Sequence, residues 1–384
     1  MKKDFEAIIG QIKSMYSGQD MVPLHAPRFF GNEKRYLEEC IDTTYVSYVG
    51  RFVTAFEDQV KKLLGLRNAV AIVNGTAALH MTLLSSGIGQ GDEVITQALS
   101  FAATAAGIRH SGADPAFVDV DRDSLGMSPS SLDDFLTAKG ERKANGLYDR
   151  ENGKRIAAVI PMHTFGHPAR IAEIRQVCDD HDVPLIEDAA ESIGSRIGER
   201  HMGTYGKAAI LSFNGNKTVT AGGGGMIVTN DDVLAERVRH ISTTAKIKHR
   251  WEYFHDEVGY NLRLTNLNAA VACAQMEYLD EILKSKRLVT EEYIRFFDEK
   301  GIAFVKERPG CHSNYWLNAI IMDNREERDA FLAYSNDNGV QTRPAWTLLN
   351  KLPPYSMSTR TDLVNAEWLE DRIVNIPSGV RPWD

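Results

Sequence analysis

The feature of this sequence that most constrains its fold is the alternation of short apolar segments with helical segments between residues 69 and 229. The apolar segments are rich in valine, isoleucine and alanine, and the segments between them carry apolar residues at helical spacing. This alternation is typical of a parallel sheet covered by helices on both faces. We therefore expect an α/β protein with about seven strands in a mostly parallel central sheet. The expected strands are residues 69–73, 93–96, 115–120, 156–160, 183–188, 208–213 and 226–229.

The alternation ends after Leu234, where a second region begins. A long helix is expected at about residues 265–282, because its apolar residues form one stripe. The pattern predicts a large α/β domain at residues 1–245, which includes the N-terminal segment, and a smaller α+β domain at residues 246–384. Residues 140–153 are polar and rich in glycine, so they are expected to form a loop.

Charge and composition narrow the class of protein. The 384 residues carry a formal charge of −8, which argues against general binding to nucleic acid or to an anionic membrane. No apolar run approaches the roughly 20 residues of a membrane span, and the N-terminus does not resemble a signal peptide, so we expect a cytoplasmic protein. The four cysteines form no C-x-x-C pair, and neither a metal site nor a disulfide framework is expected.

Three of the expected strands end in residues that can carry chemistry. The first strand is followed by Asn74-Gly75-Thr76 and a helix, and the free N–H groups of a helix N-terminus can bind phosphate. Asp188 closes the fifth strand and Lys217 follows the sixth. Each also has a simpler interpretation, as an ordinary turn, a helix cap and a surface lysine. Ligands bind at the carboxyl ends of parallel strands, so we expect the three groups to face one site.

These groups match the requirements of pyridoxal 5'-phosphate (PLP). Its phosphate can bind a helix N-terminus, its ring nitrogen needs a carboxylate that keeps it protonated, and its aldehyde needs a lysine amine. An aromatic side chain can stack on the ring, and Phe101 follows the end of the second strand. The sequence therefore predicts a PLP site that contains Gly75, Asp188 and Lys217.

Seven motifs carry a specific resemblance to a known family. They are NGTAAL (74–79), FAAT (101–104), HTFGHP (163–168), IEDAAES (186–192), SFNGNK (212–217), GYNLR (259–263) and TRPAW (342–346). In this order and spacing they resemble the PLP-dependent sugar aminotransferases of the DegT/DnrJ/EryC1/StrS family. The resemblance runs from about Pro23 to Pro377 and covers nearly the whole chain.

The resemblance implies a transferase of fold type I that forms a homodimer, with each active site shared between the two subunits. It implies that Lys217 bonds covalently to PLP, that Asp188 contacts the pyridine nitrogen and that Glu191 lies near the ring hydroxyl. Phe101 is expected to stack on the ring. The phosphate contacts implied are Gly75, Thr76 and Ser212, together with Asn261 of the partner subunit. Contacts with the substrate are expected at His163, Arg343 and Trp346.

A finer resemblance concerns the substrate. The SFNGNK motif with the glycines at 222–225, VSYVGRFV (46–53) and HDEVGYN (255–261) resemble the LegC-like subgroup, which aminates C4 of UDP-4-keto-6-deoxy-N-acetylglucosamine. Those enzymes serve bacillosamine and legionaminic acid pathways. The implied amino donor is L-glutamate, and pyridoxamine 5'-phosphate is the implied intermediate form of the cofactor.

Three alternatives remain open at this point. The chain could aminate a 3-keto or other nucleotide keto-sugar, or it could bind PLP without catalysis, although Lys217, Asp188 and Ser212 are all present. The strand and helix rhythm also fits a nicotinamide dehydrogenase. The turn at Gly75 lacks the G-x-G-x-x-G pattern, which argues against that class.

Overall fold

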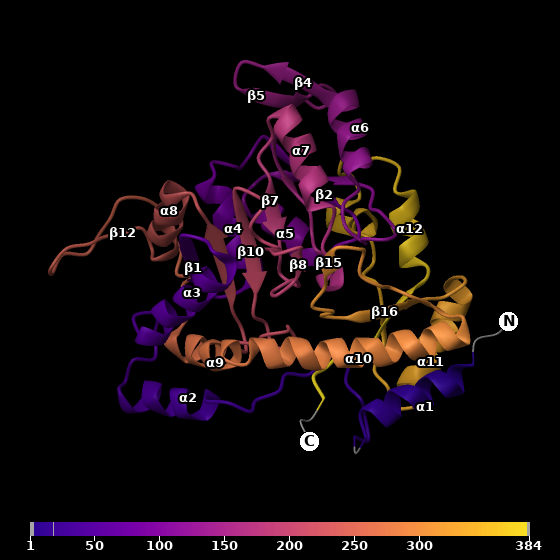
Figure 1. Cartoon of the computed structure of the whole chain (residues 1–384). Helices are drawn as coiled ribbons and strands as arrows, with labels where there is room; N and C mark the ends of the chain where they lie inside the picture. The colour runs from indigo at the N-terminus through magenta and orange to yellow at the C-terminus, as the bar shows by residue number, and fades with distance from the viewer. Residues whose placement is uncertain (1–3, 18, 382–384) are drawn as a thin grey trace.

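The central sheet of the protein has the predicted α/β architecture. The computed structural model describes residues 4–17 and 19–381, and Figure 1 shows their arrangement. Within these residues, seven strands lie in the order β1-β11-β10-β7-β6-β2-β3, and two bridges between the segments of β6 and β7 join the two halves. The predicted strands are all present. They are β1 (Asn68–Ile72), β2 (Asp92–Gln97), β3 (Asp114–Val118), β6 (Arg155–Ile160), β7 (Ile186–Asp188), β10 (Ala208–Ser212) and β11 (Gly225–Thr229).

Helices cover both faces of this sheet, because successive side chains of a buried strand point to opposite sides. In β10, Ala209 and Leu211 pack on the side of α3 and α9, whereas Ile210 packs on the side of α4 and α8. Among the helices in the described ranges, none is long and apolar enough to cross a membrane. The helices around the sheet are α2 (Glu33–Asp42), α3 (Arg51–Leu64), α4 (Gly75–Ser85), α5 (Ala102–His110), α6 (Pro129–Lys139), α7 (Ile171–His181), α8 (Asp232–Ser242) and α9 (Asn266–Met276).

The C-terminal part is an α+β unit built on a small antiparallel sheet with the order β14-β16-β18-β17. The long helix α10 crosses the molecule below the central sheet in Figure 1. The elements of this part are α10 (Leu279–Lys300), β14 (Ala303–Phe304), β16 (Asn318–Ile321), α11 (Arg325–Asp337), β17 (Arg343–Pro344), α12 (Val364–Glu370) and β18 (Ile373–Ile376). A separate three-stranded sheet joins β8 (Arg196–Ile197), β9 (Arg200–His201) and β15 (Cys311–His312).

Two sequence predictions were wrong about local structure. The helix expected at 265–282 is two helices, because Tyr278 leaves helical geometry between α9 and α10 and packs edge-on against Phe30, with ring centroids 5.1 Å apart. The loop expected at 140–153 contains a hairpin of β4 (Gly140–Lys143) and β5 (Gly146–Asp149). The strand β4 is largely exposed and polar, so it carries none of the apolar alternation that identifies a half-buried strand.

The N-terminal helix packs against the C-terminal part of the chain. Helix α1 (Phe5–Met15) buries Ile8 and Ile12 in a cluster with Val289 and Phe297 of α10. Another cluster combines residues of the central sheet region with residues of the C-terminal part, including Phe117 and the Trp316 segment. The two parts therefore share a core, and the boundary at residue 245 stays a prediction.

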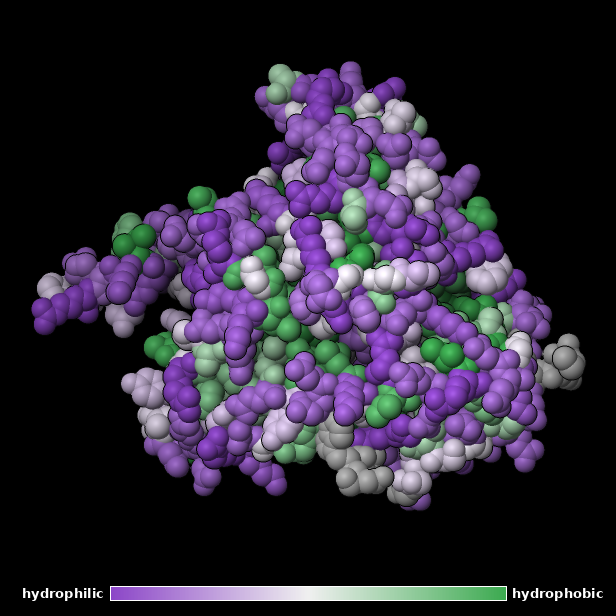
Figure 2. All heavy atoms as spheres, in the orientation of Figure 1, coloured by the Kyte–Doolittle hydropathy of each residue, from purple (hydrophilic) through white to green (hydrophobic). Residues whose placement is uncertain are grey.

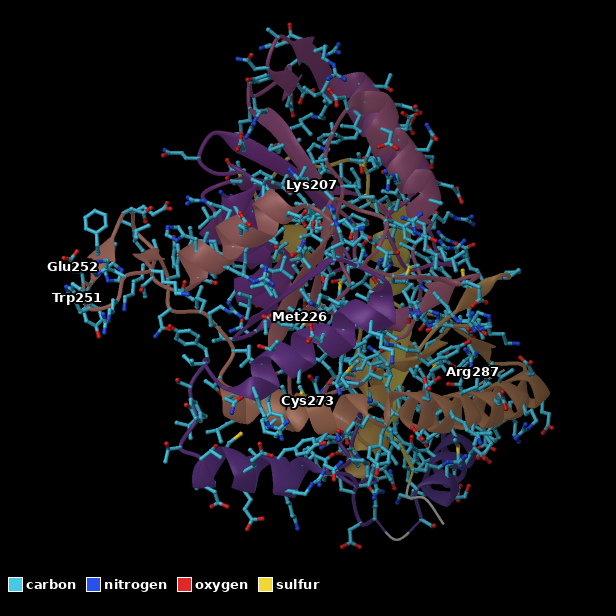
Figure 3. The ribbon with its side chains drawn as sticks, turned by 60° about the vertical axis from the view of Figure 1, so that its left-hand side comes forward. Lys207, Met226, Trp251, Glu252, Cys273 and Arg287 are labelled. Atoms are coloured by element: carbon cyan, nitrogen blue, oxygen red, sulfur yellow. The ribbon has the colours of Figure 1, made fainter. Side chains whose placement is uncertain are left out.

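One hairpin stands clear of the body of the molecule, as Figures 1 and 2 show. It joins β12 (Lys246–Ile247) to β13 (Phe254–His255). Trp251 and Glu252 lie at its tip in Figure 3, and the Trp251 side chain is exposed. The hairpin leads through an irregular segment to Asn261 and then to α9.

Gly225, at the start of β11, meets the turn between β1 and α4. A Cβ atom at this position would overlap the carbonyl group of Asn74 and would lie 2.7 Å from the amide nitrogen of Gly75. Such contacts are too short for carbon and backbone atoms, so a side chain here requires the backbone to move. The close approach explains why a glycine ends the 222–225 run, and it fixes β11 against the first turn of α4.

We predict that Gly225→Ala lowers the free energy of unfolding by about 2 kcal/mol, because an extra methyl group in a filled space forces the backbone apart. Gly10→Ala is the matched control, since a Cβ at Gly10 in α1 meets nothing within 4 Å. That control should gain roughly 0.5–1 kcal/mol from the better helix propensity of alanine. Urea unfolding of both variants measures the difference, and equal stability of G225A and the unmodified protein would contradict the packing argument.

Candidate active site

A cavity of ≈ 340 Å³ opens where β7 and β10 end and α4 begins. It brings together most of the residues that the sequence singled out. Its lining comprises Asn74, Gly75, Thr76, Leu79, Phe101, Ala103, Thr104, Met162, Asp188, Ala190, Glu191, Ile210, Ser212, Asn214, Asn216, Lys217, Trp316 and Trp346. The carboxyl ends of strands thus form the site, as expected for an open α/β sheet.

One end of the cavity has the properties of an anion site. Asn74 caps α4, and its side chain accepts a hydrogen bond of 2.8 Å from the amide of Ala77. The first amides of a helix have no acceptor within the helix, so those of Gly75 and Thr76 are available to a ligand. Ser212, at the end of β10, lies against Gly75, where a Cβ atom would come within 3.2 Å of the serine Cβ. Backbone amides and two hydroxyl groups therefore surround one small space.

Asp188 provides a buried carboxylate in the same cavity. Its Oδ2 accepts a hydrogen bond of 2.7 Å from the hydroxyl of Thr104, and its Oδ1 accepts one of 3.2 Å from the amide of Ala190. Burial raises the pKa of Asp188 above its usual value, and the hydrogen bonds oppose that rise. A cationic partner, such as a protonated ring nitrogen, would stabilise the charged form of this buried carboxylate.

Lys217 lies between a carboxylate and an aromatic ring. Its Nζ is 3.2 Å from Oε1 of Glu191 and 3.9 Å from the ring centroid of Trp316. Burial raises the pKa of Glu191 to about 7, although Lys217 and the amide of Phe165, which donates a 2.8 Å hydrogen bond to Oε2, both oppose the rise. Glu191 can therefore gain or lose a proton beside the lysine near neutral pH.

Phe165 is held in a conformation that suits this contact. Its φ of 56° lies in the left-handed region, which is unusual for an aromatic residue. The conformation occurs in the turn of the HTFGHP motif, and the Phe165 amide points at Glu191. The side chain is fully buried and packs against Trp346 at 5.0 Å between ring centroids. The motif thus positions a hydrogen-bond donor as well as an apolar wall.

The residues present fit PLP. The anion site at α4 and Ser212, the carboxylate of Asp188 and the amine of Lys217 face one cavity, and they correspond to the phosphate, the ring nitrogen and the aldehyde. Phe101 lines the same cavity and is about half exposed, so its ring is available for stacking.

Comparison with known proteins decides the family. The sequence profile of the DegT/DnrJ/EryC1/StrS aminotransferase family matches residues 29–381. This chain belongs to that family. It is therefore a PLP-dependent aminotransferase.

Relatives and solved structures agree with this membership. GDP-perosamine synthase of Vibrio cholerae is 34% identical over 361 residues, which cover 93% of this chain and 94% of that protein. GDP-perosamine synthase of Escherichia coli O157:H7 is 34% identical over 357 residues and 93% of each chain. A DegT DnrJ EryC1 StrS aminotransferase from Brucella abortus superposes with a TM-score of 0.82 at 25% identity, over 98% of this chain and 94% of that one. These relatives do not support the LegC-like subgroup that the motifs suggested.

Three predicted site residues lie outside the lining of this cavity. His163 is fully buried; its Nδ1 accepts a hydrogen bond from the Ala169 amide, and its Nε2 lies 3.1 Å from Glu187. Both ring nitrogens of His163 therefore have partners within the protein, and its contact with a substrate stays a prediction. Asn261 is exposed and lies in the segment after the projecting hairpin. Arg343 lines an adjoining cavity instead.

The adjoining cavity, of ≈ 570 Å³, shares Asn216, Trp316 and Trp346 with the first. Arg343 contributes a guanidinium group, whose Nη1 donates hydrogen bonds to the Asn336 side chain and to the carbonyl of Thr342. Trp346 therefore stands between the cofactor site and a second space large enough for part of a substrate. Arg343 and Trp346 both line this space, and their contact with a substrate stays a prediction.

Sequence reasoning missed Thr104 and Trp316. Thr104 is the fourth residue of the quoted FAAT motif, and its place one helical turn after Phe101 puts its hydroxyl at the same strand edge as Asp188. That spacing is a signal which could have identified it. Trp316 belongs to a segment that the sequence marks only as apolar, so no local pattern connects it with Lys217.

The arrangement can carry out proton transfer in an enclosed space. When bound, PLP supplies an aldehyde and a ring that stabilises negative charge at the carbon next to the reacting amino group. Asp188 would hold the ring nitrogen in its protonated form, because a buried anion favours a cationic neighbour. The free amine of Lys217 would be the base that accepts and returns a proton during amino transfer. Phe101, Trp316 and Trp346 line the site with aromatic rings that limit the access of water.

We predict that Thr104→Val weakens PLP binding and slows the reaction with glutamate, each by about tenfold. Valine keeps the volume of threonine but removes a charge-assisted hydrogen bond to Asp188, which is worth roughly 1.5–3 kcal/mol. Thr82→Val is the matched control, because Thr82 is also buried and its hydroxyl bonds only to the carbonyl of Ala78. Titration with PLP and stopped-flow absorbance measure both effects, and unchanged constants in T104V would exclude this role.

We also predict that Glu191→Gln changes the pH dependence of stability in the PLP-free protein. The raised pKa of Glu191, about 7 against a usual 4.5, means that the folded protein keeps a proton which the unfolded chain releases. The free energy of unfolding should therefore fall as pH rises from 4.5 to 7, by up to about 3 kcal/mol relative to E191Q. Urea unfolding at several pH values tests this, and parallel curves for the two proteins would refute it.

Proposed function

We propose that this protein transfers the amino group of L-glutamate to C4 of a nucleotide-linked 4-keto-6-deoxy sugar. The observation that carries the proposal is the joint placement of Lys217, Asp188 and the N-terminus of α4 in one cavity. The adjoining space beside Trp346 and Arg343 supports a second, larger substrate that approaches from that side. Two half-reactions in one site imply ping-pong kinetics.

The nucleotide is the finer part of the proposal, and two observations bear on it. The motifs at 212–225 and 255–261 favour UDP-4-keto-6-deoxy-N-acetylglucosamine. The names of relatives that are 34% identical over nearly their whole length favour a GDP-linked sugar. Both nucleotide sugars therefore belong in the test, as does a 3-keto sugar, which the same cofactor site could aminate.

We further propose that the working enzyme is a homodimer in which Asn261 reaches the PLP phosphate of the partner subunit. Asn261 is exposed and does not line the cavity of its own chain, which supports a role across an interface. The cavity of one chain contains one cation, Lys217, among the described residues that line it, so further phosphate contacts have to come from elsewhere. The predicted cytoplasmic location stays part of this proposal.

The decisive experiment follows the absorbance of the PLP-loaded enzyme. Glutamate should convert the bound cofactor to pyridoxamine 5'-phosphate, and the correct nucleotide sugar should restore the first spectrum. The three substrates to compare are a GDP-linked 4-keto-6-deoxy sugar, UDP-4-keto-6-deoxy-N-acetylglucosamine and a 3-keto nucleotide sugar. Restoration by neither 4-keto sugar would reject the C4 assignment, and a lack of response to glutamate would reject the donor.

Lys217→Ala should abolish both half-reactions, because no other residue in the described lining offers an amine. Lys207→Ala is the control. Lys207 directly precedes β10, its Nζ lies 3.7 Å from Asp231, and it is not among the residues that line the cavity. Figure 3 labels Lys207 above Met226 of the neighbouring strand β11. Activity in K217A at the level of K207A would remove the lysine from the mechanism.

A further inference from the structure

Trp316 forms a wall between the two adjoining cavities, and its position is fixed by three hydrogen bonds. Its amide donates to Oδ1 of Asn314 at 2.8 Å, and its indole Nε1 donates to the carbonyl of Asn216 at 2.7 Å. Its carbonyl accepts a hydrogen bond from Nζ of Lys286 at 3.3 Å. Since Asn216 precedes Lys217 directly, the ring is tied to the backbone of the lysine whose amine it contacts.

Lys286 anchors Trp316 from the protein interior. Its side chain, on α10, is fully buried, and its Nζ also donates to the carbonyl of Ser378 at 2.6 Å and lies 3.1 Å from Nε2 of His25. Burial lowers the pKa of Lys286 to about 7, which shows that keeping an amine here is costly. An apolar side chain would avoid this cost, so the three acceptors explain why a lysine is useful at this place.

The amine of Lys217 has two partners when it is not bonded to the cofactor. Glu191 lies 3.2 Å away, and the face of the Trp316 ring lies 3.9 Å away. An aromatic face attracts an ammonium group, and the attraction is stronger where water is excluded. An imine nitrogen carries at most one N–H group, whereas a free ammonium group carries three, so a bonded lysine nitrogen has a weaker contact with the ring. The ring therefore favours the released lysine over the bonded one.

This difference matters at the step in which glutamate displaces Lys217. The C=N bond to the lysine nitrogen breaks as a C=N bond to the donor nitrogen forms, two protons of the donor ammonium pass to the lysine, and Lys217 leaves as an ammonium group. No electrons are gained or lost overall. We propose that the face of Trp316, positioned by Lys286, is the resting place of the Lys217 amine after its displacement. The inference rests on the amino transfer proposed above.

Leucine and phenylalanine at position 316 test the proposal. W316L removes the aromatic face, so the reaction with glutamate should slow by roughly threefold to thirtyfold while PLP binds as tightly as before or more tightly. W316F keeps a ring and should lie between W316L and the unmodified protein. Trp368→Leu is the control, since the Trp368 ring of α12 contacts Arg122 and Arg372 and is not part of either cavity. Damage to the fold would weaken PLP binding together with the rate, and that outcome would overturn the proposal.

Lys286→Met tests the positioning residue separately. Like W316L, K286M should slow the reaction with glutamate while the affinity for PLP stays the same or rises. In the double variant, K286M should add little to the effect of W316L. Additive effects, or equal losses of PLP affinity and rate, would show that Lys286 does not act through Trp316. Failure of the unmodified enzyme to react with glutamate would count against the proposed donor alone, because PLP affinities of the variants report on Trp316 independently.

Discussion

The close contact between Gly225 and the Asn74–Gly75 turn is the constraint on which the site depends. It sets the start of β11 directly against the first turn of α4, and β11 in turn pairs with both β1 and β10. The same register brings Ser212 opposite Gly225. The anion site and the segment that leads to Lys217 are thereby held together by backbone geometry, with little freedom left to side chains. Pairing of β10 with β7 then sets Asp188 on the same edge.

The site could be predicted from sequence where its chemistry sits at the ends of apolar strands. Gly75, Asp188 and Lys217 each follow a buried strand, and the parallel arrangement of such strands implies a common edge. The end of a strand can be recognised from a short stretch of a single sequence. Thr104 and Trp316 depend instead on how α5 and the C-terminal segment pack against that edge. Such contacts join residues 84 and 100 positions apart, and no local pattern reports them.

The fold was predictable because its central strands are buried, and the two exceptions depend on other interactions. All seven central strands are fully or largely buried, so apolar runs reveal them. The strand β4 pairs through its backbone and keeps its side chains in solvent, which leaves no hydrophobic signal. The break at Tyr278 arises because the N-terminal segment at Phe30 packs there, and helix propensity alone cannot show it. Elements that depend on backbone pairing alone, or on packing between distant segments, therefore cannot be predicted from the hydrophobic pattern.

The cavity contains two buried carboxylates, and each of them needs a cationic partner. Asp188 and Glu191 are both buried, and burial raises the pKa of each, so the site resists a second negative charge unless a cation arrives. The Lys217 ammonium group meets that need beside Glu191, and a protonated ring nitrogen of PLP would meet it beside Asp188. A phosphate adds negative charge at the opposite end, where the described lining supplies amide dipoles and hydroxyl groups in place of cations. Lys217 contacts Glu191 and Trp316 and would form no salt bridge with a phosphate at the other end of the cavity. Its amine therefore stays available for proton transfer.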